Sequence, residues 1–299
     1  MKILLFGKNG QLGWELQRSL AVLGNVVAVG RDTPGLAGDF SRPADLVDTV
    51  LAVRPDVVVN AAAYTAVDQA EREPDLANTV NTTAPAVLAQ TAQRIGAWLV
   101  HYSTDYVFDG RGRTPFAEAD ATAPLNVYGR TKLEGELQVK QTNPRHLILR
   151  TSWVYAARGS NFARTMLRLA QERTELKVVD DQIGAPTGAD LLADATAQAL
   201  RQVVAQPDGL AHAGLYHLAA GGEASWFDYA RLVLQQAQSR GFRLQVQPDD
   251  IERVPSSAFP TAAQRPHNSR LDTRKFRKTF GLELPEWQSG VRRMVEEIL

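Results

Sequence analysis

A tyrosine and a lysine four positions apart, Tyr128 and Lys132 in the segment NVYGRTK, are the first candidates for chemistry in this chain. On a helix the two side chains would lie on one face, one turn apart. A free tyrosine has a pKa near ~10, and a neighbouring ammonium group would stabilise the phenolate and lower that pKa. The pair therefore predicts a general acid beside its tuning charge. An exposed helix turn that carries a chance pair has the same spacing.

Three glycines at three-residue spacing, Gly7, Gly10 and Gly13, directly follow the apolar segment KILLF and open a helical pattern. Gly7 would permit a tight turn, Gly10 a close approach of the backbone to a pyrophosphate, and Gly13 tight packing of helix on strand. The helix N-terminus would supply free N–H groups for the anion. The pattern predicts a dinucleotide site, with a purely structural turn as the alternative.

The end of the second predicted strand bears on the choice between NADPH and NADH. Gly30 and Arg31 stand where NAD-binding proteins usually carry an acid, and Asp32 follows. Arg31 would pair with a 2′-phosphate, which favours NADPH. Alternatively, Arg31 is solvated and Asp32 binds the ribose of NADH. Further expected cofactor contacts are Gln11, Leu12, Asp39, Phe40, Ala61, Ala62, Ala63 and Thr65.

Composition excludes several classes of protein. The 299 residues include 33 acidic and 33 basic side chains, so no net field attracts nucleic acid or a charged membrane surface. The absence of cysteine excludes disulfides, thiolate metal sites and a catalytic thiol. The apolar N-terminal run is too short for a signal peptide, and no apolar run approaches the ~18 residues of a membrane span. The sequence predicts a cytoplasmic protein.

Short apolar segments alternate with helical patterns through the first half of the chain. Because such strands are apolar on both sides, they predict a doubly wound, Rossmann-like parallel sheet between helix layers. The predicted strands are residues 2–6, 25–29, 55–62, 97–103 and 146–152, with 214–222 as a return to the sheet. The predicted helices are 11–24, 43–53, about 73–94, one from about 128, 161–173 and 188–204.

The regularity loosens after residue 155, which predicts a second unit. We expect a dinucleotide-binding domain of residues 1–155 plus about 186–222. A smaller, partly interleaved C-terminal lobe of about 156–185 and 223–299 would bind the substrate. The proline- and serine-rich loop 254–272 is long for a compact domain, which favours a functional segment.

Together these features resemble the extended short-chain dehydrogenase/reductase family. The resemblance covers essentially the full chain and is carried by segments such as HYSTDYVF, PLNVYGRTKLEGE, RTSWVYA, DQIGAPTGADLLAD and RPHNSRLD. It implies that Tyr128 donates a proton to a sugar carbonyl, that Lys132 holds the nicotinamide ribose and lowers the pKa of Tyr128, and that Thr104 replaces the usual serine. Tyr102 would lie close to the cofactor. The implied reaction is NADPH-dependent reduction of the 4-keto group of dTDP-4-dehydro-L-rhamnose, for bacterial surface glycans.

The resemblance also implies contacts with a small dTDP-sugar. Asp105 would bind a sugar hydroxyl or cap its own loop. Trp153 would pack on the sugar nucleotide or serve as a core aromatic, and Arg265 would grip the diphosphate or stay solvated. Asn126, Asn268 and Ser269 complete the expected substrate contacts. Tyr106 follows Asp105 where related dehydratases carry a second acid, so elimination of water is not expected.

Some members of this family dimerise around a magnesium ion held by three acids, and the matching positions here are Glu15, Asp190 and Glu297. Oxygen ligands suit Mg²⁺, but Asp190 is one methylene shorter than the family's glutamate, and surface carboxylates are common. The ion and the homodimer both stay open. The five histidines show no metal spacing, and His101 is expected to pack beneath the sheet edge.

Two other functions remain open at this stage. One is a different nucleotide-sugar oxidoreductase or epimerase on the same fold. The other is a non-catalytic subunit that resembles the regulatory β subunit of methionine adenosyltransferase. The presence of Thr104, Tyr128 and Lys132 together argues against the non-catalytic function.

Overall fold

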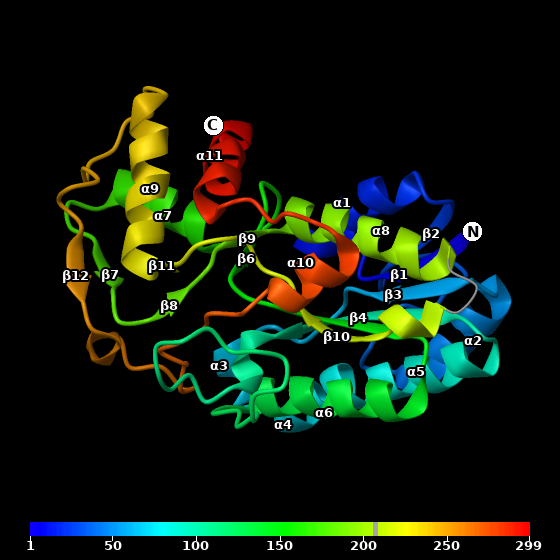
Figure 1. The fold of residues 1–299 in the computed structure, drawn as a ribbon. Coiled ribbons are helices and arrows are strands. Elements are labelled where there is room, and N and C mark those ends of the chain that lie inside the picture. Colours follow the sequence, from blue (N-terminus) through cyan, green and yellow to red (C-terminus); the bar gives the residue numbers. More distant parts are fainter. Residues whose placement is uncertain (206–208) are drawn as a thin grey trace.

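A six-stranded parallel sheet forms the centre of the fold in the computed structural model, which describes residues 1–205 and 209–299 (Figure 1). The strands lie in the order β10-β5-β4-β3-β1-β2, and every neighbouring pair is parallel. Their bounds are β1 Lys2–Phe6, β2 Asn25–Val29, β3 Val57–Asn60, β4 Trp98–Thr104, β5 His146–Thr151 and β10 Gly214–His217. Each lies within or matches a predicted strand segment, except that β4 ends one residue later, at Thr104, so the predicted doubly wound α/β fold is confirmed.

Helices cover both faces of this sheet, which is why β3, β4 and β5 are buried at every residue. Two apolar clusters, one on each face, join the helices to the strands. One face carries α1 Gln11–Ala21, α8 Ala189–Ala205 and α10 Arg274–Phe280; the other carries α2 Pro43–Val53, α5 Ala84–Arg94 and α6 Val127–Thr142 (Figure 1). No helix in the described part of the chain combines the length and apolarity that a membrane crossing requires.

The remaining elements form a lobe beside the sheet with an apolar cluster of its own. We propose that this lobe is the predicted substrate lobe, residues of about 156–185 and 223–299. Of the predicted dinucleotide-binding segment 186–222, residues 206–208 lie outside the described residues. The lobe contains α7 Phe162–Glu172, α9 Trp226–Ser239 and α11 Trp287–Ile298, and the strand pairs β7 Lys177–Val179 with β12 Glu252–Val254 and β8 Ile183–Gly184 with β11 Ala224–Ser225. At its border, β6 Val154–Tyr155 pairs with β9 Thr187–Gly188.

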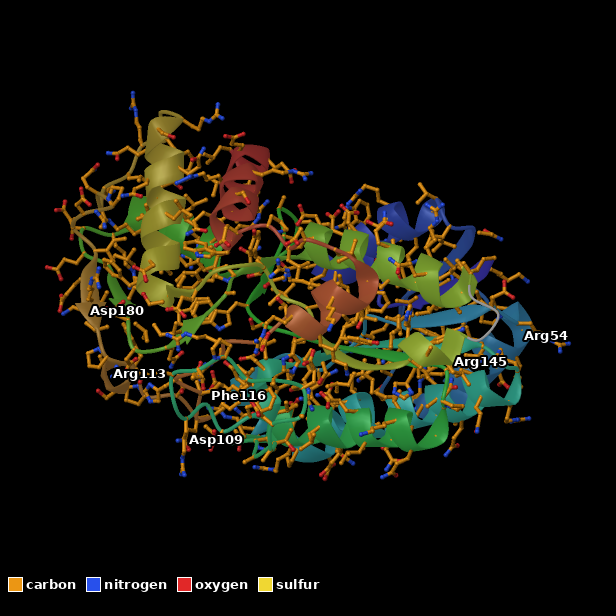
Figure 2. All side chains as sticks on the ribbon, in the orientation of Figure 1. Arg54, Asp109, Arg113, Phe116, Arg145 and Asp180 are labelled. Carbon is orange, nitrogen blue, oxygen red and sulfur yellow. The ribbon has the colours of Figure 1, made fainter. Side chains whose placement is uncertain are left out.

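The carboxyl ends of the strands point toward this lobe. Figure 2 shows Arg54 and Arg145, which precede β3 and β5, at one end of the molecule, and Asp109, which follows β4, nearer the lobe residue Asp180. Ligands of doubly wound sheets bind at the carboxyl edge. The lobe and the carboxyl edge of the sheet therefore face each other.

The predicted helical stretch 73–94 is confirmed, but it is not one regular α-helix. The chain forms α4 Pro74–Asn78, then a π-helical turn Thr79–Thr83, and only then α5. The buried Asn81 side chain in this turn accepts from the Tyr64 backbone N–H at 2.8 Å and donates to the Tyr64 carbonyl at 3.1 Å. A π turn widens the helix locally. It brings Asn81 against both the loop after β3 and helix α6.

Helix α6 lies unusually close to its neighbours because two of its residues are glycines. A Cβ on Gly129 would lie 2.2 Å from the Tyr106 carbonyl oxygen, and one on Gly135 would lie 2.1 Å from the Asn81 carbonyl oxygen. Both neighbours are backbone atoms and cannot swing away. The seat of α6 on the sheet therefore requires glycine at both positions.

We expect Gly135→Ala to lower the free energy of unfolding by about 2–3 kcal/mol, because the added methyl group forces α6 away from the π turn. Chemical denaturation measures this change. Gln138→Ala, on the exposed side of the same helix, is the control and should change stability by less than about 0.5 kcal/mol. Equal stability of the two variants would contradict the close packing of α6 against the π turn at Gly135.

Candidate active site

The N-terminus of α6 is fixed by two side chains from outside the helix. Asn126 is the N-cap and accepts from the Gly129 N–H at 2.8 Å, while Glu71 accepts from the Val127 N–H at 2.7 Å. These bonds satisfy orphan donors of the first turn. They place Tyr128, the second residue of the helix, at a defined position. The edge of the Tyr106 ring meets the Tyr128 ring, with centroids 5.6 Å apart.

Lys132 reaches from α6 to the end of β4. Its ammonium group donates to the Tyr102 carbonyl at 2.6 Å and lies 3.5 Å from Nε2 of His101, and the side chain is buried. The Tyr102 hydroxyl pairs instead with Thr196 on α8 at 2.7 Å. The backbone of Tyr102, rather than its phenol, therefore belongs to the site. His101 is buried in β4, consistent with a packed side chain.

The protonation of Tyr128 differs from the sequence-based expectation. Burial raises the pKa of Tyr128 to about 12, and a hydrogen bond with Thr104 opposes this rise only partly. Burial also lowers the pKa of Lys132, to about 8. The expected lowering of the Tyr128 pKa by Lys132 is thus wrong for this structure, because burial of the phenol dominates its pKa. The phenol is fully protonated at neutral pH.

Asp105 is a buried carboxyl group beside the same phenol. Its Oδ1 accepts from the Thr104 hydroxyl at 3.1 Å, and its Oδ2 has no partner among the described residues. Burial raises the pKa of Asp105 to about 7, while hydrogen bonds from Ser269 and Thr104 oppose the rise. Asp105 therefore titrates near neutrality and faces the reaction centre.

A pocket of about 200 Å³ lies over the carboxyl ends of β1, β2 and β3. It is lined by Gly7, Asn9, Gly10, Gly30, Arg31, Gly38, Phe40, Ala62, Ala63 and Val80. Gly7 has φ +87°, and a Cβ there would lie 2.8 Å from the backbone of Ala61 and Ala62. A Cβ on Gly13 would lie 1.9 Å from the Gly7 carbonyl oxygen. The glycine turn therefore keeps the carboxyl edge of β1 open, and the small residues there fit the close approach of a pyrophosphate to the backbone.

The other expected cofactor residues surround this pocket or support it. Gln11 accepts from Asn161 at 3.0 Å, which links α1 to the lobe. Leu12 packs into the apolar cluster, Phe40 meets Phe6 edge to face, and Thr65 is exposed.

Charged side chains gather at the end of β2. Asp32 accepts from Asn9 at 3.0 Å and lies 3.6 Å from the Lys8 ammonium. Arg31 lies 3.7 Å from Asp39 and leaves 79% of its side chain exposed. Lys8 and Asn9 were not predicted from the sequence. Their only signal was their position inside the glycine turn.

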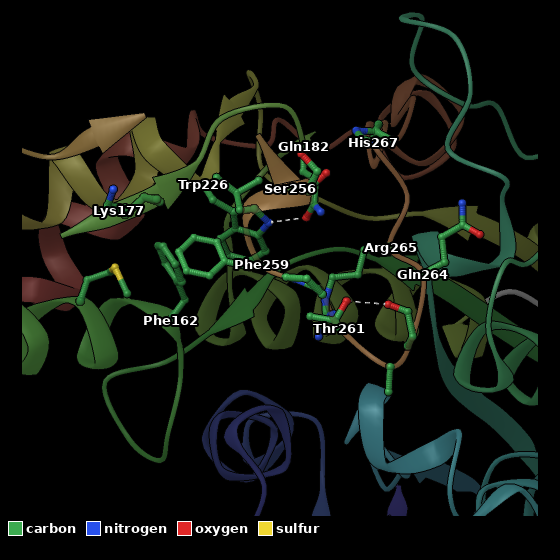
Figure 3. A pocket seen from close by; sticks show the side chains of 17 residues that line it. Phe162, Lys177, Gln182, Trp226, Ser256, Phe259, Thr261, Gln264, Arg265 and His267 are labelled. Atoms are coloured by element: carbon green, nitrogen blue, oxygen red, sulfur yellow. Dashed lines mark hydrogen bonds between the residues drawn. The ribbon is translucent and has the colours of Figure 1, made fainter. Parts of the chain in front are cut away.

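A larger pocket of about 670 Å³ opens in the lobe (Figure 3). Its apolar walls include Phe162, Trp226 and Phe259, and cationic side chains stand at its rim. The Trp153 indole stacks on Trp226, with ring centroids 3.7 Å apart, so Trp153 forms the layer behind this wall. Arg265 lines the pocket and pairs with Asp68 at 2.7 Å.

Three residues that were expected to contact the substrate also make hydrogen bonds within the chain, and their contact with substrate stays a prediction. Besides capping α6, Asn126 donates to the Gln264 carbonyl at 2.8 Å, and it is 2% exposed. Asn268 is 1% exposed and donates to the Thr114 carbonyl at 2.9 Å, while Ser269 is buried beside Asp105. Because their polar atoms are occupied, Asn126 and Asn268 position the loop 254–272 against α6 and the loop after β4. The sequence-based prediction did not distinguish such support from ligand contact.

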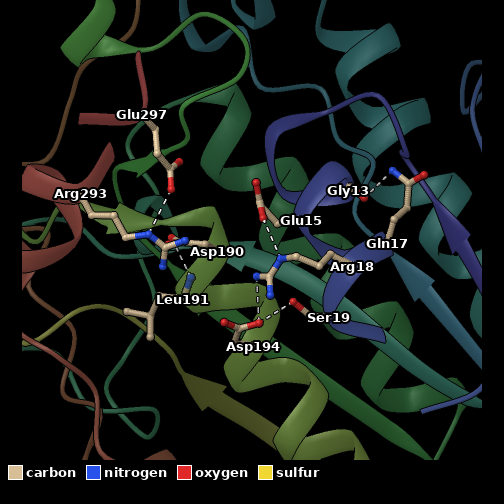
Figure 4. A network of polar contacts seen from close by, with 10 residues as sticks. All are labelled: Gly13, Glu15, Gln17, Arg18, Ser19, Asp190, Leu191, Asp194, Arg293 and Glu297. Carbon is tan, nitrogen blue, oxygen red and sulfur yellow. Dashed lines mark hydrogen bonds and ion pairs between the residues drawn. The ribbon is translucent and has the colours of Figure 1, made fainter. Parts of the chain in front are cut away.

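The three expected metal ligands are paired with arginines (Figure 4). Glu15 lies 3.5 Å from Arg18, whereas Asp190 and Glu297 flank Arg293 at 3.5 and 3.1 Å. Across residues 1–205 and 209–299, no three acidic or histidine side chains form a group that could hold a metal ion. A site completed by a second copy stays a prediction.

A dinucleotide pocket at β1, and a helix whose Tyr-x-x-x-Lys pair meets a threonine at the end of β4, define an extended short-chain dehydrogenase/reductase. The sequence model of the family described as RmlD substrate binding domain matches residues 1–299. The dTDP-4-dehydrorhamnose reductase of Escherichia coli (strain K12) is 56% identical over 298 residues, covering 100% of this chain and 98% of that protein. The one from Burkholderia thailandensis is 48% identical over 300 residues, covering 100% and 99%.

A solved structure gives the same result. The dTDP-4-dehydrorhamnose reductase of Bacillus anthracis str. Ames, determined in complex with NADP, has a TM-score of 0.86 at 33% identity and covers 99% of both chains. The chain belongs to the RmlD family of dTDP-4-dehydrorhamnose reductases and is an oxidoreductase.

The raised pKa of Asp105 predicts a pH-dependent stability. Between about pH 4 and 7 the folded protein holds a proton that the unfolded chain releases, so the free energy of unfolding falls as the pH rises. Asp105→Asn removes this loss, and we expect its melting temperature to exceed that of the original protein by a few degrees at pH 8 and by less at pH 5. Asp48→Asn, on the exposed side of α2, should show no such divergence. Parallel melting curves across this range would refute the assignment.

Proposed function

We propose that this protein reduces the 4-keto group of dTDP-4-dehydro-L-rhamnose to give dTDP-L-rhamnose, with Tyr128 as the proton donor, for surface polysaccharide synthesis. The observation that carries the proposal is the convergence of Tyr128, Lys132 and Thr104 at the end of β4. The names of the relatives supply the substrate.

The protonation state of the site suits reduction rather than oxidation. A phenol with a pKa of about 12 keeps its proton at neutral pH, yet it still donates readily to an alkoxide, which is a far stronger base. The Thr104 hydroxyl stabilises the phenolate left behind by hydrogen bonding. Oxidation would need the phenolate at the start, which burial disfavours.

The glycine turn, the Ala61–Ala63 backbone and Lys132 would hold the cofactor, which supplies the hydride when bound. Arg31 supports a preference for NADPH over NADH, since its guanidinium is exposed at the pocket that would receive the adenosine end.

The lobe pocket would receive the nucleotide part of the sugar substrate. Phe162 and Trp226 offer flat apolar walls for a base, and Lys177, Arg265 and His267 offer positive or hydrogen-bonding groups for a diphosphate. The Gln264 carbonyl in this wall accepts from Asn126, the cap of α6, so the pocket borders the first turn that carries Tyr128. Asp105 would then contact the sugar.

We further propose a location, an oligomeric state and a metal site. The protein would act in the cytoplasm. A second copy would form a homodimer, and Mg²⁺ would bind Glu15, Asp190 and Glu297 at that interface. For the metal, Arg293 must first release two of these acids.

Tyr128→Phe removes the proposed acid while keeping the ring. We expect kcat to fall at least about 100-fold, because general acid catalysis typically contributes this much, with the Kd for NADPH changed less than about twofold. A coupled assay that generates the 4-keto sugar in place and follows NADPH absorbance measures kcat. Tyr216→Phe is the control: its hydroxyl donates to the His212 carbonyl at 3.0 Å, on the far strand β10.

Retention of most of the rate by Tyr128→Phe would show that the proton comes from another group. Product formation without net NADPH consumption would point to an epimerase instead.

Arg31→Ala tests the cofactor preference. We expect the Kd for NADPH to rise about tenfold, through loss of the pairing with the 2′-phosphate, and the Kd for NADH to stay within about twofold. Fluorescence titration of the reduced dinucleotides measures both constants. Arg42→Ala, an exposed arginine paired with Asp45 on α2, should change neither. Equal weakening of both dinucleotides would reject Arg31 as a discriminating residue.

A further inference from the structure

A buried ion pair joins the helix that carries Tyr128 and Lys132 to strand β5. Arg150 donates through Nε to Oε1 of Glu136 at 2.9 Å and through Nη2 to Oε2 at 2.7 Å. The two side chains are only 5% and 4% exposed. Desolvation of two charges costs about as much as such a pair gains, so stability alone does not account for it.

Arg150 also contacts the segment that follows Thr104. Its guanidinium lies over the Phe108 ring, 5.0 Å from the centroid, and Phe108 directly follows the short turn Asp105–Val107. The Phe108 ring in turn stacks on Phe116 at 4.3 Å. The ion pair therefore joins α6, which carries Tyr128 and Lys132, to the segment that follows β4 and Thr104.

Glu136 stands one helical turn beyond Lys132, so the two side chains lie on the same face of α6. Burial lowers the pKa of Lys132, and the Glu136 carboxylate acts against this effect. The other groups around the ammonium supply no counter-charge: His101 is kept neutral by burial, and Tyr128 is a protonated phenol. Asp105 faces Tyr128 from the end of β4, and Arg150 lies behind Glu136.

We propose that Glu136 is a positioning residue for the reduction: held by Arg150 of β5, it fixes the turn of α6 that carries Lys132, so that the buried ammonium group stays on the Tyr102 carbonyl. The inference rests on the proposed function only for its activity measurement. It extends the reaction centre of Tyr128, Lys132 and Thr104 by two side chains, Glu136 on α6 and Arg150 on β5.

Glu136→Gln tests this role with an isosteric side chain. We expect the alkaline limb of the pH profile of kcat/KM to move about one unit lower, since Lys132 loses its proton earlier without a facing carboxylate. The Kd for NADPH, measured by fluorescence without turnover, should begin to rise at the same lower pH. Glu134→Gln, an exposed acid two residues earlier on α6, is the matched control and should leave both profiles unchanged.

The double variant Glu136→Gln/Arg150→Met removes both buried charges and carries the test if the single variant does not fold. A lowered alkaline limb in the double variant supports the proposal. A uniform loss of rate at all pH values, or an alkaline limb at the original pH, shows a purely structural ion pair and overturns it. Turnover by the original protein and by Glu134→Gln tests the proposed function independently of Glu136. A failure of the proposed function is therefore distinguishable from a failure of the role proposed for Glu136.

Discussion

The contact between the Lys132 ammonium and the Tyr102 carbonyl, 2.6 Å long and buried, is the interaction on which the rest of the site depends. It can form only because α6 lies against backbone at Gly129 and Gly135. The same seat brings Tyr128 to Thr104. If α6 lay further from the sheet, Tyr128 would lose its contact with the end of β4. The close packing at Gly129 and Gly135 is therefore required for the positions of Tyr128 and Lys132.

Burial then decides the charge of each group in the centre. It raises the pKa of Tyr128 to about 12 and that of Asp105 to about 7, and it lowers the pKa of Lys132 to about 8. These directions follow from the cost of a charge in a poorly hydrated place. The resulting site holds a proton on the phenol, as a carbonyl reductase requires.

The sequence predicted the parts of this structure that depend on local pattern. The predicted bounds of the strands KILLF and NVVAV and of the helix 43–53 equal the observed ones. In each of these segments the apolar side chains that pack between sheet and helices recur at the spacing of a strand or a helix, so the sequence alone shows the element. The π turn at Thr79–Thr83 escaped prediction, since it depends on Asn81 meeting the distant backbone of Tyr64.

Only part of the site could be predicted, because several of its contacts join residues that are far apart in the sequence. The spacing of Tyr128 and Lys132 indicated them as candidates, whereas Thr104 was named through the family resemblance; the structure brings all three to the end of β4. Asn126 and Asn268 carry no signal that separates a loop-positioning amide from a ligand-binding one, and the pairing of Glu136 with Arg150 joins residues on different elements. The direction of the Tyr128 pKa shift was also beyond the sequence, because burial is a property of the assembled fold.

A crystal structure with NADP⁺ and dTDP-L-rhamnose is the most direct measurement of the central claim. The account predicts that the Tyr128 hydroxyl lies within hydrogen-bonding distance of the sugar 4-hydroxyl, with the nicotinamide ring on the opposite side of that carbon and Lys132 beside its ribose. A sugar bound with its 4-hydroxyl away from Tyr128, or a dinucleotide bound outside the glycine turn, would contradict it.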